Sequence, residues 1–145
     1  MTEIVRLKQV KMDSEYSSFQ ARGSIETVPL IQDLIGDDSQ EALVALFLDI
    51  KNKVTAFSVV FRGLTSSSNF NSKQIMQRAL ISNASRIIIA HNHPSGEPYP
   101  SEQDRNATRQ VAQAGTLLGV KLLDSLIVTK DDYYSFQEEH EMFNN

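Results

Sequence analysis

The sequence contains no cysteine, and this absence excludes several kinds of site at once. Without thiols the chain forms no disulfide, no iron–sulfur cluster and no thiolate zinc site, and it has no cysteine nucleophile. A cytidine-deaminase-like zinc enzyme in its usual form, which binds its metal through cysteines, is excluded for the same reason. Any metal ion in this protein must therefore be held by histidine and carboxylate side chains.

Long apolar runs and an excess of positive charge are also missing. No apolar run approaches the roughly 20 residues that span a bilayer, and the N-terminal stretch MTEIVRLKQVKMD lacks the apolar core of a signal peptide. We therefore expect a cytoplasmic protein that does not bind membranes. The formal charge of −4 weighs against nonspecific binding of nucleic acid, which needs a basic surface.

Length and composition indicate an ordinary globular protein. Hydrophobic residues make up 41% and charged residues 22% of the 145 residues. This length fits one domain, so residues 1–145 are interpreted as a single domain in which residues 1–27 are an N-terminal strand and extension. The acidic tail, residues 137–145, is expected to fray.

Apolar patterning predicts alternating strands and helices. Strands are expected over residues 4–12, 42–50, 54–61, 86–90, 120–129 and 133–136, and helices over residues 28–36, around 75–80 and over 101–118. Thr27 is the expected cap of the first helix, and Gly119 the expected end of the last one. Because one early hairpin interrupts the alternation, we expect an α/β fold with a mixed sheet flanked by helices.

The most polar stretch, HNHPSGEPYPSEQD at residues 91–104, directly follows a buried strand. Side chains two apart in a strand point to the same face, so His91 and His93 project together. Asp104 comes three residues after Ser101 at the predicted start of a helix, from where it can point back toward the histidines. Two histidines and one aspartate supply three protein ligands and leave a fourth position for water, as in catalytic zinc sites.

The same residues also have a purely structural interpretation. Ser-x-x-Asp at a helix start resembles a capping box, which would explain Ser101 and Asp104 without a metal. A single histidine is more often an ordinary surface or core residue than a ligand, and His140 in the acidic tail is interpreted in that way. The two histidines at i and i+2, with a carboxylate at a helix start, favour the metal site.

A hydrolytic metal centre also needs a base that takes a proton from water. Residues 42–91 contain no glutamate, and Asp49 is the one acid among them. The candidates are Glu41 and earlier residues, or Glu97 and Glu102 near the histidines. Glu41 precedes the first central strand, where one end of the sheet could bring it beside the histidines. The residues alone permit Glu41 without selecting it.

Three stretches resemble the RadC family, a bacterial branch of the JAMM (MPN+) metalloprotease superfamily: HNHPSG, PSEQD and ATRQVAQAGTLLGVKLLDSLIV. The superfamily motif is Glu, a variable gap, His-x-His, seven residues and Ser-x-x-Asp. Seven residues, PSGEPYP, separate His93 from Ser101 in this chain. The resemblance covers residues 28–136 and implies the JAMM/MPN architecture, with cytidine-deaminase-like layers of helix, sheet and helix.

The resemblance also implies a role for each residue of the site. The metal would be Zn2+, bound by His91, His93 and Asp104. Glu41 would act as general base and then as proton donor, and Ser101 would hydrogen-bond the developing oxyanion. The implied reaction is hydrolysis of an amide bond in a peptide or protein substrate, as by a peptidase or isopeptidase.

Three positions depart from the family pattern: Ser58 replaces an acidic residue, Asn71-Ser72-Lys73 replaces a Pro-Arg-Glu stretch, and Ser125 replaces the histidine of an Asp-His pair. The chain is also expected to be a short form, without the helix-hairpin-helix-like region of longer relatives. Two alternatives therefore stay open. One is a role in DNA repair or DNA processing without proteolysis, and the other is a catalytically weak scaffold that binds a partner.

Overall fold

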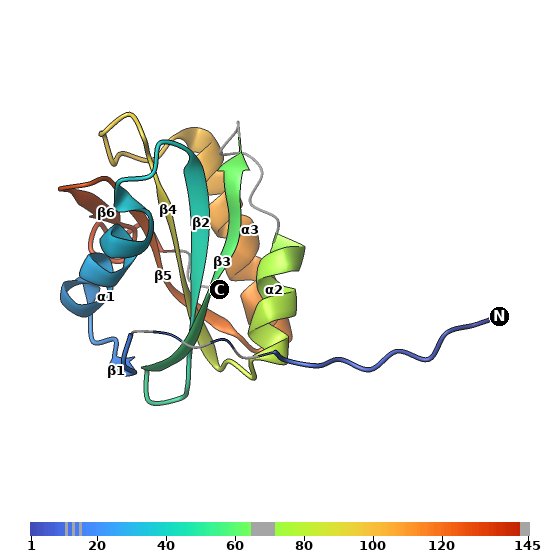
Figure 1. Ribbon diagram of the computed structural model, residues 1–145. Coiled ribbons are helices and arrows are strands. Elements are labelled where there is room, and N and C mark those ends of the chain that lie inside the picture. The colour runs from blue at the N-terminus through green and yellow to red at the C-terminus, as the bar shows by residue number, and fades with distance from the viewer. Residues whose placement is uncertain (11, 13, 15, 65–71, 143–145) are drawn as a thin grey trace.

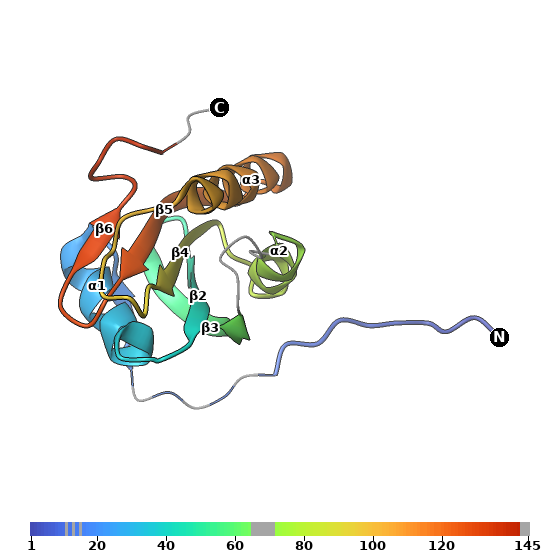
Figure 2. The same ribbon diagram turned by 90° about the horizontal axis from the view of Figure 1, so that it is seen from above.

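The computed structural model describes residues 1–10, 12, 14, 16–64 and 72–142. Its helices are α1 (Ser24–Ile31), the π-helix η1 (Gln32–Gly36), α2 (Ser72–Ile81) and α3 (Glu102–Leu118). Its strands are β1 (Phe19–Gln20), β2 (Glu41–Leu48), β3 (Lys53–Leu64), β4 (Arg86–Asn92), β5 (Lys121–Val128) and β6 (Tyr133–Ser135). The strands form one sheet in the order β1-β3-β2-β4-β5-β6. Helix α1 covers one face of this sheet, and α2 and α3 cover the other (Figures 1 and 2).

The sheet is mixed, as the sequence predicts. β2 pairs antiparallel with β3 through the expected hairpin, and it also pairs antiparallel with β4. β4 and β5 run parallel. A parallel pair needs a crossover connection, and α3 supplies it. The C-terminal end of β4 therefore leads directly into the loop and helix start that carry Ser101 and Asp104.

The two central strands, β2 and β4, are buried on both faces, which explains their continuous apolar sequence. Alternate residues belong to two separate cores. The core under α2 and α3 includes Leu43, Ala45, Phe47, Ile87 and Ile89. The core under α1 includes Ala42, Val44, Leu46, Ile88 and Ala90. Because of this alternation, the position of a residue in β2 or β4 decides which helix layer its side chain faces.

The predicted N-terminal strand over residues 4–12 is wrong. Its described residues belong to no strand, and apolar side chains such as Ile4 and Leu7 are fully exposed; Lys11 lies outside the described residues. The segment extends away from the sheet in both views (Figures 1 and 2). The first strand is β1, which pairs with Lys53 and Val54 of β3. Alternating charge and apolarity suits a strand, but a strand also requires a partner edge.

The first helix begins at Ser24 rather than at residue 28, and its N-cap is Gly23 rather than Thr27. The Thr27 hydroxyl donates a hydrogen bond to the Gly23 carbonyl, at 3.2 Å, so it binds the first turn of its own helix. Pro29 lies inside α1 and has no N–H to donate. The helix then continues as η1, which ends at the predicted Gly36.

The later elements occur where the sequence predicts them. β4 extends to Asn92, so that His91 belongs to the strand, and α3 has Ser101 as N-cap and Gly119 as C-cap. Fraying of the tail is wrong for residues up to 142, because the Glu141 N–H donates to the Phe136 carbonyl at 2.7 Å. Residues 143–145 lie outside the described residues. None of the helices in the described part of the chain is long and apolar enough to cross a membrane.

Candidate metal centre

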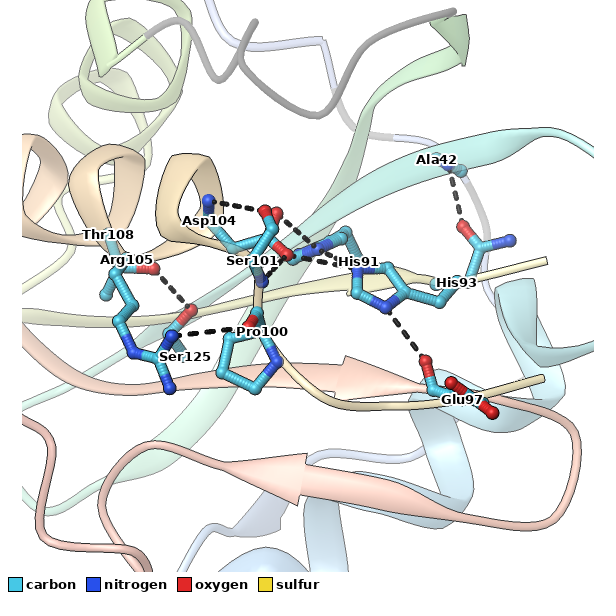
Figure 3. Close-up of polar contacts among 11 residues, drawn as sticks. Ala42, His91, His93, Glu97, Pro100, Ser101, Asp104, Arg105, Thr108 and Ser125 are labelled. Carbon is cyan, nitrogen blue, oxygen red and sulfur yellow. Dashed lines mark hydrogen bonds and ion pairs between the residues drawn. The ribbon is translucent and has the colours of Figure 1, made fainter. Parts of the chain in front are cut away.

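His91 and His93 lie at the C-terminal end of β4 (Figure 3). His91 is opposite Leu43 of β2, a residue of the core under α3, so both histidines face the α3 layer. The N–H of His93 donates to the Val128 carbonyl at 3.0 Å and thus continues the pairing with β5. With the backbone held on both sides, the two Nε2 atoms lie 3.2 Å apart. The structure thereby brings the histidines together as their spacing predicts.

Asp104 reaches the histidines from the first turn of α3. The Ser101 hydroxyl accepts a hydrogen bond from the Asp104 N–H at 3.1 Å, and Asp104 Oδ2 accepts one from the Ser101 N–H at 2.9 Å. Asp104 Oδ1 lies 3.3 Å from His91 Nε2, and Oδ2 lies 3.2 Å from His93 Nε2. The capping box is therefore present, and the same geometry directs the carboxylate at both histidines.

The three side chains could hold a metal ion, because one ligand atom of each lies within 4.8 Å of the others. Ligand atoms at about 2.0–2.2 Å from a tetrahedral zinc are roughly 3.3–3.6 Å apart, close to the 3.2 and 3.3 Å observed. Asp104 is 1% exposed, and its Oδ1 makes no hydrogen bond within the described residues. A bound cation would satisfy this buried oxygen. Two imidazoles and a carboxylate are a donor set that suits zinc.

The electrostatics of the cluster also favour a cation. Burial alone would raise the pKa of Asp104, but contacts with the two histidine side chains and the Ser101 N–H hold it well below its ordinary range. Burial alone would lower the pKa of His93. Hydrogen bonds to Asp104 and to the Glu97 carbonyl, together with the negative charges of Asp104 and Glu41, raise it above its ordinary value instead. The cluster is thus an environment that stabilises positive charge.

The loop after β4 sets the orientation of the His93 ring. His93 Nδ1 lies 3.0 Å from the carbonyl oxygen of Glu97 (Figure 3). A carbonyl oxygen only accepts, so Nδ1 carries the proton and the neutral ring has its lone pair on Nε2, the atom that faces Asp104. A backbone carbonyl on the outer nitrogen is the usual arrangement behind a metal-binding histidine.

Glu41 lies on the same face of the sheet as the histidines. It is the half-buried first residue of β2, two residues before Leu43, and residues two apart share a face. Its negative charge contributes to the raised pKa of His93. The two other candidate bases, Glu97 and Glu102, are exposed. Of the three glutamates, Glu41 is therefore the one that is half-buried and lies on the face of the sheet that carries the histidines.

A bulge between β2 and β3 adjoins Glu41. Glu41 is opposite Leu64 and Ala42 is opposite Arg62, so Gly63 is left over between them. Gly63 has a φ of 82°, which a residue with a side chain rarely adopts. Bulges bend a strand and redirect its side chains. This bulge interrupts the regular pairing of β2 with β3 at Glu41, the candidate base.

Sequence reasoning missed Asn92, which stands between the two histidines and is 1% exposed. Its Oδ1 accepts a hydrogen bond from the Ala42 N–H at 2.7 Å. Its Nδ2 donates to the carbonyls of Gln40, at 2.9 Å, and Asp38, at 3.3 Å. The signal that could have found it is the strand alternation, which turns the middle residue of His-x-His to the opposite face.

Two of the residues that depart from the family pattern, Ser58 and Ser125, form side-chain hydrogen bonds with residues of the helices. Ser58 accepts a hydrogen bond from Arg78 Nε at 3.1 Å. The Ser125 hydroxyl lies 3.1 Å from the hydroxyl of Thr108, and both residues are fully buried. In the third departure, Ser72 begins α2, whereas Asn71 lies outside the described residues.

Beside Ser125, the carboxylate of Asp124 is also buried. It accepts hydrogen bonds from the Ser135 hydroxyl at 2.6 Å and from the backbone N–H groups of Ser125 and Gln137. Burial raises the pKa of Asp124 despite these hydrogen bonds. This carboxylate joins β5 to β6 and to the start of the tail.

Arg105 follows Asp104 in α3 and connects the site to the tail. Its Nε lies 3.0 Å from Glu141 Oε2, and its NH1 group donates to the Pro100 carbonyl at 3.3 Å (Figure 3). Contact with Arg105 and Tyr134 lowers the pKa of Glu141. Burial and the hydrogen bond with Glu141 raise the pKa of Tyr134 to about 12. The tail is therefore attached to the residue next to a candidate metal ligand.

Comparison with known proteins identifies the family to which this chain is similar. Residues 16–142 match the model of a family described as the RadC-like JAB domain, a longer range than the 28–136 predicted from the resemblance. A "UPF0758 protein" of Streptococcus sanguinis is 39% identical over 123 residues, which cover 85% of this chain and 54% of the relative. A "UPF0758 protein" of Aquifex aeolicus is 44% identical over 103 residues, 71% of this chain and 45% of the relative. The chain thus spans about half the length of the curated relatives it matches.

Proposed function

This chain belongs to the family of RadC-like JAB domains, and on that premise we propose that it is a zinc-dependent metallohydrolase that cleaves amide bonds in peptide or protein substrates. The observation that carries the proposal is the buried group of His91, His93 and Asp104, with Glu41 on the same face of the sheet. Three protein ligands leave one coordination position for a reacting group, as in catalytic rather than structural zinc sites.

Bound Zn2+ supplies Lewis acidity, which lowers the pKa of water and polarises a carbonyl group. The protein's own groups handle the protons. The carboxylate of Glu41 accepts a proton from the attacking water and then gives it to the nitrogen of the leaving amine, so that the amide bond breaks to an acid and an amine. Its half-buried position on the face of the sheet that carries the histidines supports this role.

Ser101 supplies a second polar group for the reaction. Its hydroxyl oxygen accepts the Asp104 N–H with a lone pair, and the residue is exposed. The hydroxyl proton is therefore available to a substrate. A hydrogen bond from this group to the carbonyl oxygen would stabilise the negative charge that develops there during attack.

Metal analysis and a substrate panel test the proposal together. The purified wild type should contain about one Zn2+ per chain, and His91→Ala and Asp104→Ala should lose it. Glu41→Gln should keep the zinc but lose hydrolysis of peptide and isopeptide substrates by about 100-fold or more. Glu97→Gln, which changes an exposed glutamate in the loop after β4, is the matched control and should keep both. A wild type that binds no zinc, or a Glu41→Gln variant that hydrolyses normally, would overturn the proposal.

A further inference from the structure

We propose that Asn92 is the positioning residue for Glu41: its side-chain amide binds the backbone on both sides of Glu41 and so holds the carboxylate beside the histidines. The inference rests on the proposed function, because it gives Asn92 a role only through the base. It assigns a task to the middle residue of the His-x-His motif, which binds no metal itself.

Asn92 forms hydrogen bonds with the residues directly before and directly after Glu41 in the sequence. The carbonyl of the preceding residue, Gln40, accepts from Asn92 Nδ2 at 2.9 Å, and the N–H of the following residue, Ala42, donates to Asn92 Oδ1 at 2.7 Å (Figure 3 marks the bond of Ala42). The second N–H of the amide donates to Asp38 at 3.3 Å. Both donors and the acceptor of the side chain are therefore used, which fixes its orientation.

The ordinary strand ladder holds this part of β2 from the β3 side alone, and there with an interrupted register. On the β4 side, the last paired residues are Leu43 and His91, so the backbone pairing stops before Glu41 is reached. On the β3 side, the bulge at Gly63 interrupts the register between Glu41 and Ala42. The amide of Asn92 supplies the connection between β2 and β4 at the place where the backbone no longer does.

The three consecutive residues 91–93 therefore supply both histidine ligands and the amide that positions the base, Glu41. His91 and His93 face the α3 layer, whereas Asn92 faces the opposite side and reaches the segment that leads into β2. The Asn92 amide therefore links the strand that carries the histidines directly to the segment that carries Glu41. Catalysis by a base depends on such alignment, because an error of about 1 Å in position can reduce a rate about 100-fold.

A merely structural role for Asn92 would predict a different result on mutation. Loss of a buried hydrogen-bonding side chain destabilises many proteins without affecting catalysis. Thr129 offers the matched control. It is 5% exposed, and its hydroxyl likewise binds a backbone N–H and a backbone carbonyl, both of Asp132, at 3.0 and 3.3 Å, in the turn between β5 and β6.

The test compares Asn92→Ala, Asn92→Asp and Thr129→Ala in two backgrounds, the wild type and Glu41→Gln. Asn92→Ala should lower kcat about 10- to 100-fold in the wild-type background and have no further effect in the Glu41→Gln background. Zn2+ affinity, measured against a chromophoric chelator, and KM should change less than about threefold. Asn92→Asp, which keeps the acceptor but loses both donors, should behave in the same way. Thr129→Ala should leave kcat unchanged.

A second readout needs neither zinc nor turnover. In the metal-free protein at constant pH, Glu41→Gln should change the ring 15N shifts of His93, because the proposed position of Glu41 puts its carboxylate near that ring. In the Asn92→Ala background this change should be at most half as large, and the Ala42 amide should exchange its hydrogen at least about tenfold faster. Asn92→Ser replaces Asn92→Ala if the latter does not fold.

The outcomes separate this inference from the proposed function. An undiminished response of His93 to Glu41→Gln in the Asn92→Ala protein would overturn the positioning role, whatever the activity. So would an equal loss of kcat in both backgrounds, or a loss of zinc affinity, because Asn92 would then act on the ligands. Hydrolysis that is insensitive to Glu41→Gln would instead overturn the proposed base, while the ring shifts and amide exchange still test the contact itself.

Discussion

Ser101 and Asp104 bind each other through two hydrogen bonds, and the same Asp104 carboxylate lies within 3.3 Å of both histidine Nε2 atoms. The helix cap and the candidate metal ligand are thus one arrangement rather than competing explanations of the motif. A carboxylate that is attached to a helix start and buried loses little further freedom when a cation binds. The helix cap therefore holds the Asp104 carboxylate in place before a metal ion binds.

Replacement of Ser101 by alanine tests this dual role. Ser101→Ala removes the acceptor for the Asp104 N–H, so we expect a loss of about 1 kcal/mol in the free energy of unfolding. Ser101→Ala keeps the backbone N–H that binds Asp104 Oδ2, but it loosens the helix start that carries this carboxylate, so Zn2+ affinity should fall about tenfold. Urea denaturation of the metal-free protein and competition with a chelator measure the two effects. Ser101→Thr keeps the hydroxyl and should restore both, and a Ser101→Ala variant with unchanged zinc affinity would contradict the link.

The bulge beside Glu41 leads to a second prediction. Alanine at Gly63 would have to adopt a φ of 82°, and its Cβ would lie 3.3 Å from Gln40 Oε1. Gly63→Ala should therefore reduce the free energy of unfolding by about 1–2 kcal/mol. Gly23→Ala is the control, because Gly23 has an extended backbone and no atom within 4 Å of such a Cβ. Equal effects of the two substitutions in urea denaturation would show that backbone conformation at the bulge is unimportant.

The candidate ligands could be predicted because their relationships are local. Residues two apart, such as His91 and His93, share a face in any strand. An acidic residue three positions after a capping serine, as Asp104 is after Ser101, points back over the helix start in any capping box. Glu41 is different, since its position relative to the histidines depends on the register between β2 and β4, and the family resemblance had to supply its role. Asn92 was missed because its partners are backbone atoms at the start of β2, 50 residues before it in the case of Ala42.

The fold shows the same division between local and non-local information. Continuous apolar runs predicted β2 and β4 well, because a strand buried on both faces needs apolar residues throughout. Residues 4–12 have the composition of a half-exposed strand, but the sequence does not reveal whether an edge is available for pairing. The start of α1 was misplaced because Gly23 carries no side-chain cap signal, whereas Thr27 resembles one.

The pKa of Tyr134 gives a third prediction. Burial and the hydrogen bond with Glu141 raise this pKa to about 12. In Glu141→Gln the contribution of the neighbouring carboxylate is lost, so the pKa should fall toward its ordinary value of about 10 while burial keeps it above. Absorbance at alkaline pH, with Tyr134→Phe to identify the signal among the four tyrosines, measures the change. An unchanged titration would mean that the tail does not contact α3 in solution.

The buried carboxylate of Asp124 gives a prediction about stability and pH. Burial raises its pKa in the folded state, so between the ordinary carboxyl value and the raised one the folded protein binds the proton that the unfolded chain has released. The contribution of Asp124 to stability is therefore complete below the unfolded pKa of about 4 and is lost as pH rises through the folded value. Because asparagine does not titrate, Asp124→Asn should remove this part of the decline in stability above about pH 4.

Urea denaturation of the wild type, Asp124→Asn and the exposed control Asp131→Asn at several pH values measures the difference. The free energy of Asp124→Asn relative to wild type should become more favourable as pH rises, and more steeply than that of Asp131→Asn. The opposite slope for Asp124→Asn would mean that the hydrogen bonds from Ser135, Ser125 and Gln137 outweigh burial. Asp124 would then be a carboxylate stabilised in its charged form, and the contact between β5, β6 and the tail would weaken in acid instead.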